Sequence, residues 1–363
     1  MDFAYYAKDN AMPVLLSSPS GYRLFSPVQP PHRLPSGSHQ KDAACIDLGL
    51  VNNMSDGALH TTERQVLKLL DSAAGDLTVR LRLYSLTDFP RSELGERHLT
   101  RMHYSRENDL WESALDGLII TGSEPRTPDL TEEPYWNTLT EVFDWAGGNT
   151  RSTIFSCLAV HAAVRHFDGI DRRPLEDKCF GVFEFDNLSN HFLMSGVAPK
   201  FRMPHSRWNE VGESDLSSCG YTILSRSDNR GVDAFAKQNG SLYIFFQGHP
   251  EYEAWTLLSE YRRDIERFLR GERKTYPSMP VGSLDEPAVK TFNALQARAL
   301  VERSVEVLAD VEMGQFVKDL TDPWRSEAEC MYRNWLDYLS ARKAQRHEYI
   351  EPVTSGLESG RVP

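Results

Sequence analysis

Apolar positions between about residue 43 and residue 270 follow two alternating periods. Short apolar runs rich in β-branched residues are typical of buried strands, and apolar residues three and four apart are typical of amphipathic helices. This pattern predicts strands at 45–51, 79–86, 116–122, 151–157, 178–185, 220–227, 231–238 and 241–248, and helices at 61–73, 133–146, directly after 157 and at 254–272. Strands that alternate with helices predict an α/β fold, with a largely parallel sheet and helices on both faces.

The two ends of the chain differ from this middle part. Residues 1–42 are rich in Pro, Ser and Gly, which predicts an extended or partly disordered N-terminal arm before an α/β domain at 43–272. Helical spacing returns across 285–348 and predicts a C-terminal helical extension, packed on the main domain or on another subunit. Residues 349–363 have the composition of a disordered tail.

Charge and cysteine content exclude several classes of protein. The 363 residues carry a formal net charge of −12, which argues against a general nucleic-acid or anionic-membrane surface. No apolar run approaches the roughly 20 residues of a membrane span, and the N-terminus is a poor secretory signal. The five cysteines form no CxxC pair, which argues against a zinc site and favours a reducing cytoplasm. We expect no metal, no nucleic acid, no membrane and a cytoplasmic location.

Cys157 is the candidate nucleophile. It stands between an apolar strand, "STIF", and an alanine-rich helix, "LAVHAAV". Such an elbow would aim the thiol at a helix N-terminus, whose dipole and N–H groups stabilise a thiolate. The N–H of Leu158 would supply half of an oxyanion hole. The flanking glycines usual in these elbows are absent, so a small buried cysteine remains the competing interpretation.

His249 is the candidate base. It follows a strand that ends at Gly248, so it is expected at the same edge of the sheet as Cys157. Glu251, two residues later, would orient the imidazole and stabilise the imidazolium. The alternative is a His-Pro turn with a solvated glutamate, and the presence of Cys157 favours the triad. His161, one helical turn after Cys157, is expected to line the pocket or to help packing.

Six ordered motifs add a resemblance to these residues. They are "DGLIITGSEP", "EEPYWNTLTEVFDWA", "STIFSCLAVHAA", "RPLEDKCFGVFEF", "MPHSRWNEV" and "FFQGHPEYEAWTLLSEYRRD". With them, residues 43–270 resemble the homoserine O-acyltransferases of the glutamine-amidotransferase-like type, also called homoserine transsuccinylases. The resemblance implies a flavodoxin-like, class I glutamine-amidotransferase-like fold and a Cys-His-Glu triad of Cys157, His249 and Glu251. It also implies acyl transfer from acyl-CoA to the hydroxyl of L-homoserine in methionine biosynthesis, with no bound cofactor, by a homodimer.

The same resemblance gives roles to polar residues outside the triad. Lys178 falls where the family binds homoserine, and Arg263 falls on an arginine that binds the amino-acid carboxylate. Ser206 and Arg207 fall on residues that line the substrate pocket. An arginine fork suits the carboxylate of a zwitterion. From the residues alone, Arg263 would belong to a solvated helix face and Ser206 to a turn.

The choice of acyl donor depends, in the resembling family, on a residue a few positions after "TG". A glutamate there favours acetyl, and a small residue admits succinyl. Aligned without a gap, Arg126 occupies this position and could pair with the distal carboxylate of succinyl. A gap would bring Glu124 there and favour acetyl, and Arg126 could also be a loop charge without a role. We expect succinyl, with a second oxyanion donor from the loop after Gly122.

The chain departs from the family in two places near the expected site. "VNNMSDG" replaces a common lysine pair, so Asn52 or Asn53 could replace a lysine donor, and His161 stands where glutamine is common. Homoserine O-acetylation and acyl transfer to another hydroxy-amino acid therefore remain open. A glutamine amidotransferase or amidase, which would use the same triad on an amide, is the alternative from another class.

Overall fold

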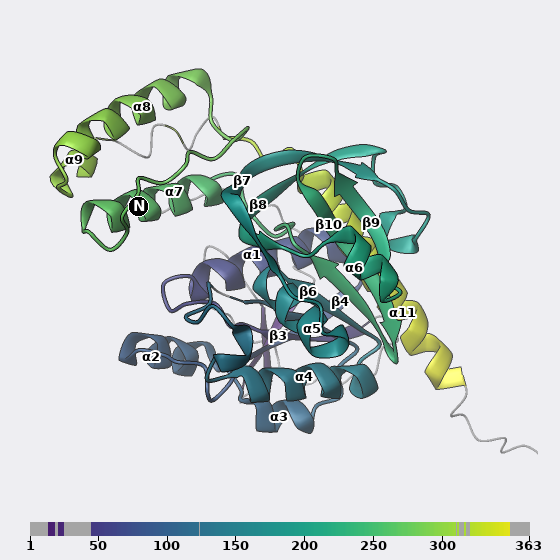
Figure 1. Ribbon diagram of the computed structural model, residues 1–363. Coiled ribbons are helices and arrows are strands. Elements are labelled where there is room, and N and C mark those ends of the chain that lie inside the picture. The colour runs from purple at the N-terminus through teal and green to yellow at the C-terminus, as the bar shows by residue number, and fades with distance from the viewer. Residues whose placement is uncertain are drawn as a thin grey trace, which may run out of the picture.

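One eleven-stranded sheet organises the molecule (Figure 1). The computed structural model describes residues 14–18, 21–24, 45–122, 124–309, 311, 316 and 320–348. The strands are β1 (Val14–Ser18), β2 (Gly21–Leu24), β3 (Cys45–Val51), β4 (Thr78–Tyr84), β5 (Gly117–Ile120), β6 (Ser152–Ser156), β7 (Arg173–Asn187), β8 (Lys200–Glu210), β9 (Thr222–Ser227), β10 (Gly231–Asn239) and β11 (Ser241–Phe246). Their order across the sheet is β2-β1-β4-β3-β5-β6-β11-β10-β9-β7-β8.

The centre of the sheet is parallel. Strands β1, β4, β3, β5, β6 and β11 all run in one direction, with Leu48 paired to Leu81 and Ile154 paired to Ile244. Antiparallel strands extend both sides: β2 beside β1, and β10, β9, β7 and β8 beyond β11. Every residue of β5, β6 and β11 is buried, as expected of strands covered on both faces. The predicted α/β fold with a largely parallel sheet is confirmed.

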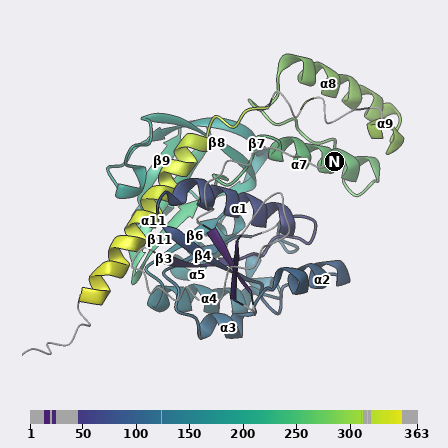
Figure 2. The same cartoon turned by 180° about the vertical axis from the view of Figure 1, so that it is seen from behind.

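Helices cover both faces of the sheet. They are α1 (Leu59–Ala74), α2 (Glu93–Met102), α3 (Glu107–Trp111), α4 (Trp136–Asn149), α5 (Leu158–Asp168), α6 (Glu213–Ser218), α7 (Thr256–Leu269), α8 (Glu286–Val301), α9 (Glu306–Ala309) and α11 (Arg325–Glu348). Side chains of successive strand residues point to opposite faces, so Ile154 joins one core and Phe155 the other. The first core contains α1, α7, α8 and α11, and the second contains α4 and α5 (Figures 1 and 2). Among the described helices, none has the length and apolarity to cross a membrane.

The elements differ from the predicted ones in informative ways. The helix predicted at 133–146 begins at Trp136, after Pro134, and β8 was not predicted as a strand. Pro204 lies inside β8, and a proline argues against a strand except at an edge, which is where β8 lies. Within the predicted N-terminal arm, β1 and β2 join the sheet. The rest of that arm and the predicted tail at 349–363 lie outside the described residues.

The C-terminal helix α11 is part of the main core (Figure 2). Its Trp335 and Leu339 pack so closely on β5 that a side chain at Gly117 would lie within 2.9 Å of both. Lys343, further along α11, donates from Nζ to Asp116 Oδ2 at 2.7 Å and to the Cys45 carbonyl at 2.8 Å. The predicted helical extension therefore closes one face of the sheet.

Replacing Trp335 by alanine is expected to lower the free energy of unfolding by about 3–5 kcal/mol, because it leaves a large cavity under α11. Trp335 is fully buried, whereas Val301 at the end of α8 is 91% exposed. Val301→Ala is therefore the matched control and is expected to change stability by less than about 0.5 kcal/mol. Urea unfolding of both variants measures the difference. Equal stability of the two variants would show that α11 does not contribute to the core.

Candidate active site

Cys157 lies on a strained elbow between β6 and α5. Its backbone has φ 53° and ψ −112°, a conformation that residues other than glycine rarely adopt. The strain is held in place because Cys157 N donates to the Phe246 carbonyl at 2.9 Å and Val160 N donates to the Cys157 carbonyl at 3.0 Å. Such strain is typical of nucleophile elbows. The elbow forms without flanking glycines because Phe155 points into the core, where it stacks on Phe245 with ring centroids 4.9 Å apart.

His249 and Glu251 form a buried pair after β11. His249 Nδ1 is 2.8 Å from Glu251 Oε1, and the His249 ring stacks on Tyr252 with centroids 4.1 Å apart. A side chain at Gly248 would lie 2.6 Å from Asp233 Oδ1, so the close approach of this buried side chain favours glycine here. The structure therefore brings Glu251 to the histidine nitrogen that a triad acid would hold.

Cys157 is the other electrostatic neighbour of His249. Burial lowers the pKa of His249, but the negative charges of Cys157 and Glu251 outweigh burial and hold this pKa well above its usual value. The Nε2 atom of His249 has no hydrogen bond of standard geometry among the described residues, and both the charge of Cys157 and a side-chain interaction with it raise the pKa of His249. The arrangement suits a thiolate–imidazolium pair, which is an activated cysteine nucleophile.

A cavity of about 780 Å³ opens beside Cys157. This volume lies within the usual range of small-molecule sites, about 300–1,000 Å³. The candidate residues that line it are Gly122, Arg126, Cys157, Leu158, Lys178, Ser206, Arg207, His249 and Arg263. Glu251 stands behind His249. Among the described residues, no cluster of three or more His, Cys, Asp or Glu side chains could hold a metal ion.

Two carboxylates on α7 organise one end of the cavity. Lys178 Nζ lies 3.4 Å from Asp264 Oδ2 and 3.8 Å from Glu260 Oε2, and the Ser206 hydroxyl donates to Glu260. Arg263 Nη2 is 3.3 Å from Asp264 Oδ1, and its side chain is half exposed. Glu260 and Asp264 were not predicted, although their spacing on the amphipathic helix at 254–272 places them on one helix face. Both charges of a zwitterion could find partners here.

Arg207 makes most of its hydrogen bonds to other groups of the protein. It is buried, and its guanidinium donates to His205 Nδ1 at 3.3 Å, to the Asn209 carbonyl at 3.0 Å and to the Arg230 carbonyl. It lines the cavity, as the resemblance implied. These bonds hold the end of β8 and leave few donors for a substrate.

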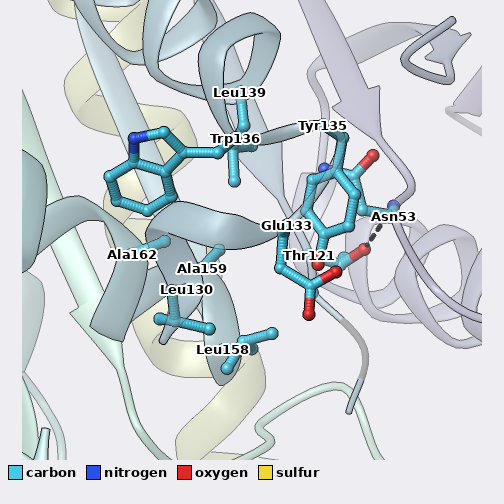
Figure 3. Close-up of a pocket in the computed structure, with 11 residues that line it drawn as sticks. Asn53, Thr121, Leu130, Glu133, Tyr135, Trp136, Leu139, Leu158, Ala159 and Ala162 are labelled. Atoms are coloured by element: carbon cyan, nitrogen blue, oxygen red, sulfur yellow. Dashed lines mark hydrogen bonds between the residues drawn. The ribbon is translucent and has the colours of Figure 1, made fainter. Parts of the chain in front are cut away.

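The loop after β5 approaches the N-terminus of α5 closely. A side chain at Gly122 would lie 2.9 Å from both the Ala159 nitrogen and the Leu158 Cβ, so glycine is required there. Glu133 holds the loop, because its Oε1 accepts the backbone N–H groups of Arg126 and Thr127. Figure 3 shows Glu133, Leu158, Asn53 and Thr121 among the residues that line a small cavity beside this loop.

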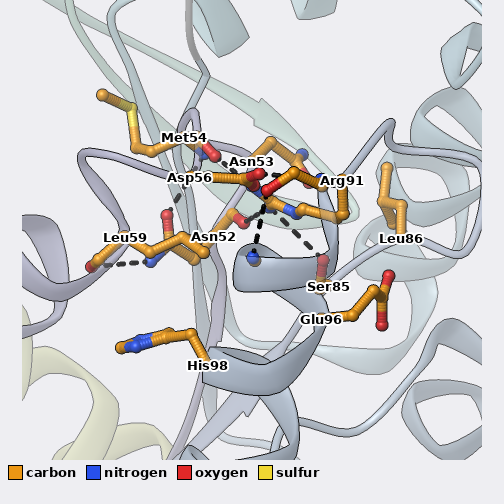
Figure 4. A network of polar contacts seen from close by, with 12 residues as sticks. Asn52, Asn53, Met54, Asp56, Leu59, Ser85, Leu86, Arg91, Glu96 and His98 are labelled. Carbon is orange, nitrogen blue, oxygen red and sulfur yellow. Dashed lines mark hydrogen bonds and ion pairs between the residues drawn. The ribbon is translucent and has the colours of Figure 1, made fainter.

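The segment "VNNMSDG", which stands in place of the family's lysine pair, is held by hydrogen bonds from Arg91. Arg91 donates to the carbonyls of Asn52 and Met54 and pairs with Asp56 at 3.3 Å (Figure 4). The Asn52 amide donates to the Tyr104 hydroxyl at 2.9 Å, so it is engaged inside the fold. The Asn53 side chain is buried and has no partner among the described residues. Of the two asparagines, Asn53 alone remains a candidate for the missing lysine donor.

His161 lies in the same cavity as Cys157 but in a neutral form. Burial lowers the pKa of His161 to about 3, and its Nε2 is 3.2 Å from Gln247 Oε1. An imidazole with so low a pKa is a poor general base at neutral pH. It therefore belongs to the cavity wall.

The pKa of His161 predicts sensitivity to acid. The unfolded histidine binds a proton below about pH 6.5, whereas the folded one does so only near pH 3. The unfolded state therefore binds more protons in this window, and the free energy of unfolding falls by at most about 1.4 kcal/mol per pH unit as the pH decreases. Urea unfolding of His161→Gln is therefore expected to show a smaller fall in the free energy of unfolding between pH 7 and pH 4 than that of the wild type. Parallel losses would mean that His161 is protonated in the folded protein.

Comparison with known proteins places the chain in a family. The family model for homoserine O-succinyltransferase matches residues 34–346. The chain is 42% identical over 299 residues to a homoserine O-succinyltransferase of Rhodopseudomonas palustris, covering 82% of this chain and 90% of the relative. It is 39% identical over 316 residues to one of Bradyrhizobium japonicum, covering 86% and 96%. A solved glutamine amidotransferase of Thermotoga maritima is 8% identical, with a TM-score of 0.43 over 81% of this chain and 98% of that one. By its sequence, the chain belongs to the homoserine O-succinyltransferase family.

Proposed function

We propose that the protein transfers a succinyl group from succinyl-CoA to the hydroxyl of L-homoserine, through an acyl intermediate on Cys157. One observation carries the proposal: the strained Cys157 elbow and the buried His249–Glu251 pair meet at one cavity, in a chain of this family. Succinyl-CoA is then a co-substrate, and the product belongs to methionine biosynthesis.

In the first half-reaction, the Cys157 thiolate attacks the thioester carbonyl. A new S–C bond forms, and the carbonyl electrons move onto oxygen, where the Leu158 N–H and a donor from the loop after Gly122 stabilise the charge. The bond from carbon to the sulfur of CoA then breaks. His249 gives its proton to the departing CoA thiolate, so free CoA leaves and a neutral imidazole remains.

In the second half-reaction, His249 acts as the base. The charges of Cys157 and Glu251 raise the pKa of His249 against the effect of burial, and acylation of Cys157 removes one of these charges. The imidazole therefore gives up its proton more readily once the acyl group is attached, which suits a general base. It takes the proton of the homoserine hydroxyl, the oxygen attacks the acyl carbon, and the Cys157 thiolate leaves beside the imidazolium.

The α7 end of the cavity suits homoserine. Glu260 and Asp264 would accept the substrate ammonium, while Arg263 would bind its carboxylate with a planar fork. Lys178 and Ser206 already bond to these carboxylates and would hold them in place. The role proposed for Arg263 agrees with the resemblance, whereas the resemblance implied that Lys178 binds homoserine itself.

Succinyl is favoured over acetyl by the charges near the loop after β5. Arg126 lines the cavity and would pair with the distal carboxylate of succinyl. Glu124, which would favour acetyl if it faced the acyl group, is 3.3 Å from Arg267 on α7. Its charge is therefore already compensated at the exposed rim.

The assembly and location are further proposals. The five cysteines are all unpaired, which agrees with a reducing cytoplasm. A homodimer rests on the family resemblance.

CoA release tests the proposed function. Free-thiol release is measured from succinyl-CoA and from acetyl-CoA, each with and without L-homoserine, together with the mass of the product. Homoserine-dependent release from succinyl-CoA is the expected result. Preference for acetyl-CoA would overturn the donor, and glutamine hydrolysis without acyl transfer would overturn the reaction.

A further inference from the structure

The cations that line the cavity differ in how they are compensated. At the α7 end, Lys178, Arg263 and Arg273 all lie within 3.5 Å of Asp264 carboxylate oxygens. Arg126 and Arg172 lie in the same cavity, but no carboxylate of the described residues is within ion-pair distance of their side chains. The cavity therefore has one end with paired charges and another with an excess of positive charge.

Arg172 has an unused donor at this positive end. Its Nη2 donates to the Pro128 carbonyl at 2.6 Å, which fixes the guanidinium, while its Nη1 is buried without a partner among the described residues. Burial also lowers the pKa of Arg172, and Asp129 and Glu133 offset this only in part. A buried cationic donor without an acceptor costs free energy, so its presence in a cavity indicates an anionic ligand.

The position of Arg172 relates this donor to Cys157. His161, in the first turns of α5 after Cys157, has Arg172 among its charged neighbours. Tyr135 has both Arg126 and Arg172 among its charged neighbours. Figure 3 shows Tyr135 beside Glu133, the side chain that holds the backbone of Arg126, and Leu158, the residue after Cys157, lines the same small cavity. The two arginines thus line the same cavity as the nucleophile.

We propose that Arg172, together with Arg126, binds the distal carboxylate of the succinyl group while its thioester carbon is on Cys157. The inference rests on the proposed succinyl transfer and adds a residue that determines donor specificity. In this proposal the unpaired Nη1 of Arg172 and the guanidinium of Arg126, which line the same cavity, would bind one carboxylate, and the bond to Pro128 fixes the Arg172 side chain. Acetyl has no carboxylate and would leave the Arg172 Nη1 unpaired.

The decisive experiment compares two donors that share the same CoA phosphates. Values of kcat/KM for succinyl-CoA and acetyl-CoA are measured on wild type and Arg172→Gln. In this variant kcat/KM is expected to fall about 100-fold with succinyl-CoA, because a site built to bond a polar group of its substrate discriminates strongly. With acetyl-CoA it is expected to change less than about threefold. Arg172→Lys keeps the charge without the fork and is expected to fall between.

Arg173→Gln is the matched control. Arg173 is the next residue, is mostly exposed, and pairs with Asp215 on α6, away from the cavity. Its variant is expected to match the wild type with both donors. If Arg172→Gln lowered kcat/KM equally with both donors, the guanidinium would bind the CoA phosphates and the inference would be overturned. An unchanged kcat/KM with both donors would overturn the inference as well. Wild type without homoserine-dependent CoA release from succinyl-CoA would instead overturn the proposed function itself.

If Arg172→Gln unfolds, Arg172→Lys decides. A fall in kcat/KM with succinyl-CoA but not with acetyl-CoA would support the carboxylate subsite. The same ratio of variant to wild-type kcat/KM with both donors would overturn it.

Discussion

Cys157→Ala is expected to lower the rate of homoserine succinylation by at least about 10⁴-fold, because removing a nucleophile leaves only binding and oxyanion stabilisation. Both half-reactions pass through the Cys157 sulfur, so CoA release without homoserine should stop as well. Steady-state assays of CoA release and ester formation measure both losses. The strain of the Cys157 elbow comes from its backbone, so the variant is expected to keep the cavity.

Cys219→Ala is the control for this result. Cys219 is also an unpaired, partly exposed cysteine, but it lies at the end of α6 and does not line the cavity. It is expected to keep wild-type rates. Activity of Cys157→Ala within tenfold of the wild type would rule out an acyl-cysteine pathway.

His249→Asn is expected to lower kcat/KM by about 10³-fold, because a positioned general acid and base contributes about 10²–10⁴-fold. The loss should affect both half-reactions, since His249 gives a proton to CoA and later takes one from homoserine. Glu251→Gln keeps the ring in place but removes one of the charges that raise the pKa of His249, so its pH–rate profile should shift to lower pH. Rates measured across pH 5–9 test both variants.

His166→Asn provides the matched histidine control. His166 lies on α5, near Cys157 in sequence, but its Nε2 faces Asp144 at 2.8 Å on the outer surface. Unchanged rates are expected. If His249→Asn kept full activity in either half-reaction, another group would have to move that proton.

Much of the fold could be predicted because its signals are local. Strands such as β6 and β11 are continuous apolar runs, and α1 and α7 have clear helical spacing, so the alternation that defines the sheet is visible in the sequence. β8 was missed because its edge position, which tolerates Pro204, depends on long-range pairing with β7. The membership in the homoserine O-succinyltransferase family, predicted from six motifs, is confirmed.

The residues of the candidate site also divide into those that the sequence predicted and those that it did not. Cys157 and His249 were found because each follows a strand end, and parallel strands bring such positions to one edge of the sheet. Glu260 and Asp264 were missed because acids on an amphipathic helix usually face solvent. No sequence pattern marks Arg172, and its place in the cavity, its buried Nη1 and the bond from its Nη2 to the Pro128 carbonyl distinguish it from Arg173 only in three dimensions. Such roles depend on three-dimensional contacts that local spacing does not encode.

The most direct test of the central claim is the intact mass of the protein after brief mixing with succinyl-CoA in the absence of homoserine, followed by peptide mapping. We expect the mass to rise by one succinyl group, carried on the peptide that contains Cys157, and to return to its starting value when L-homoserine is added. Cys157→Ala should show no such increase. A wild-type protein that forms the succinyl ester yet carries no acyl group on Cys157 at any time would contradict the acyl-cysteine mechanism.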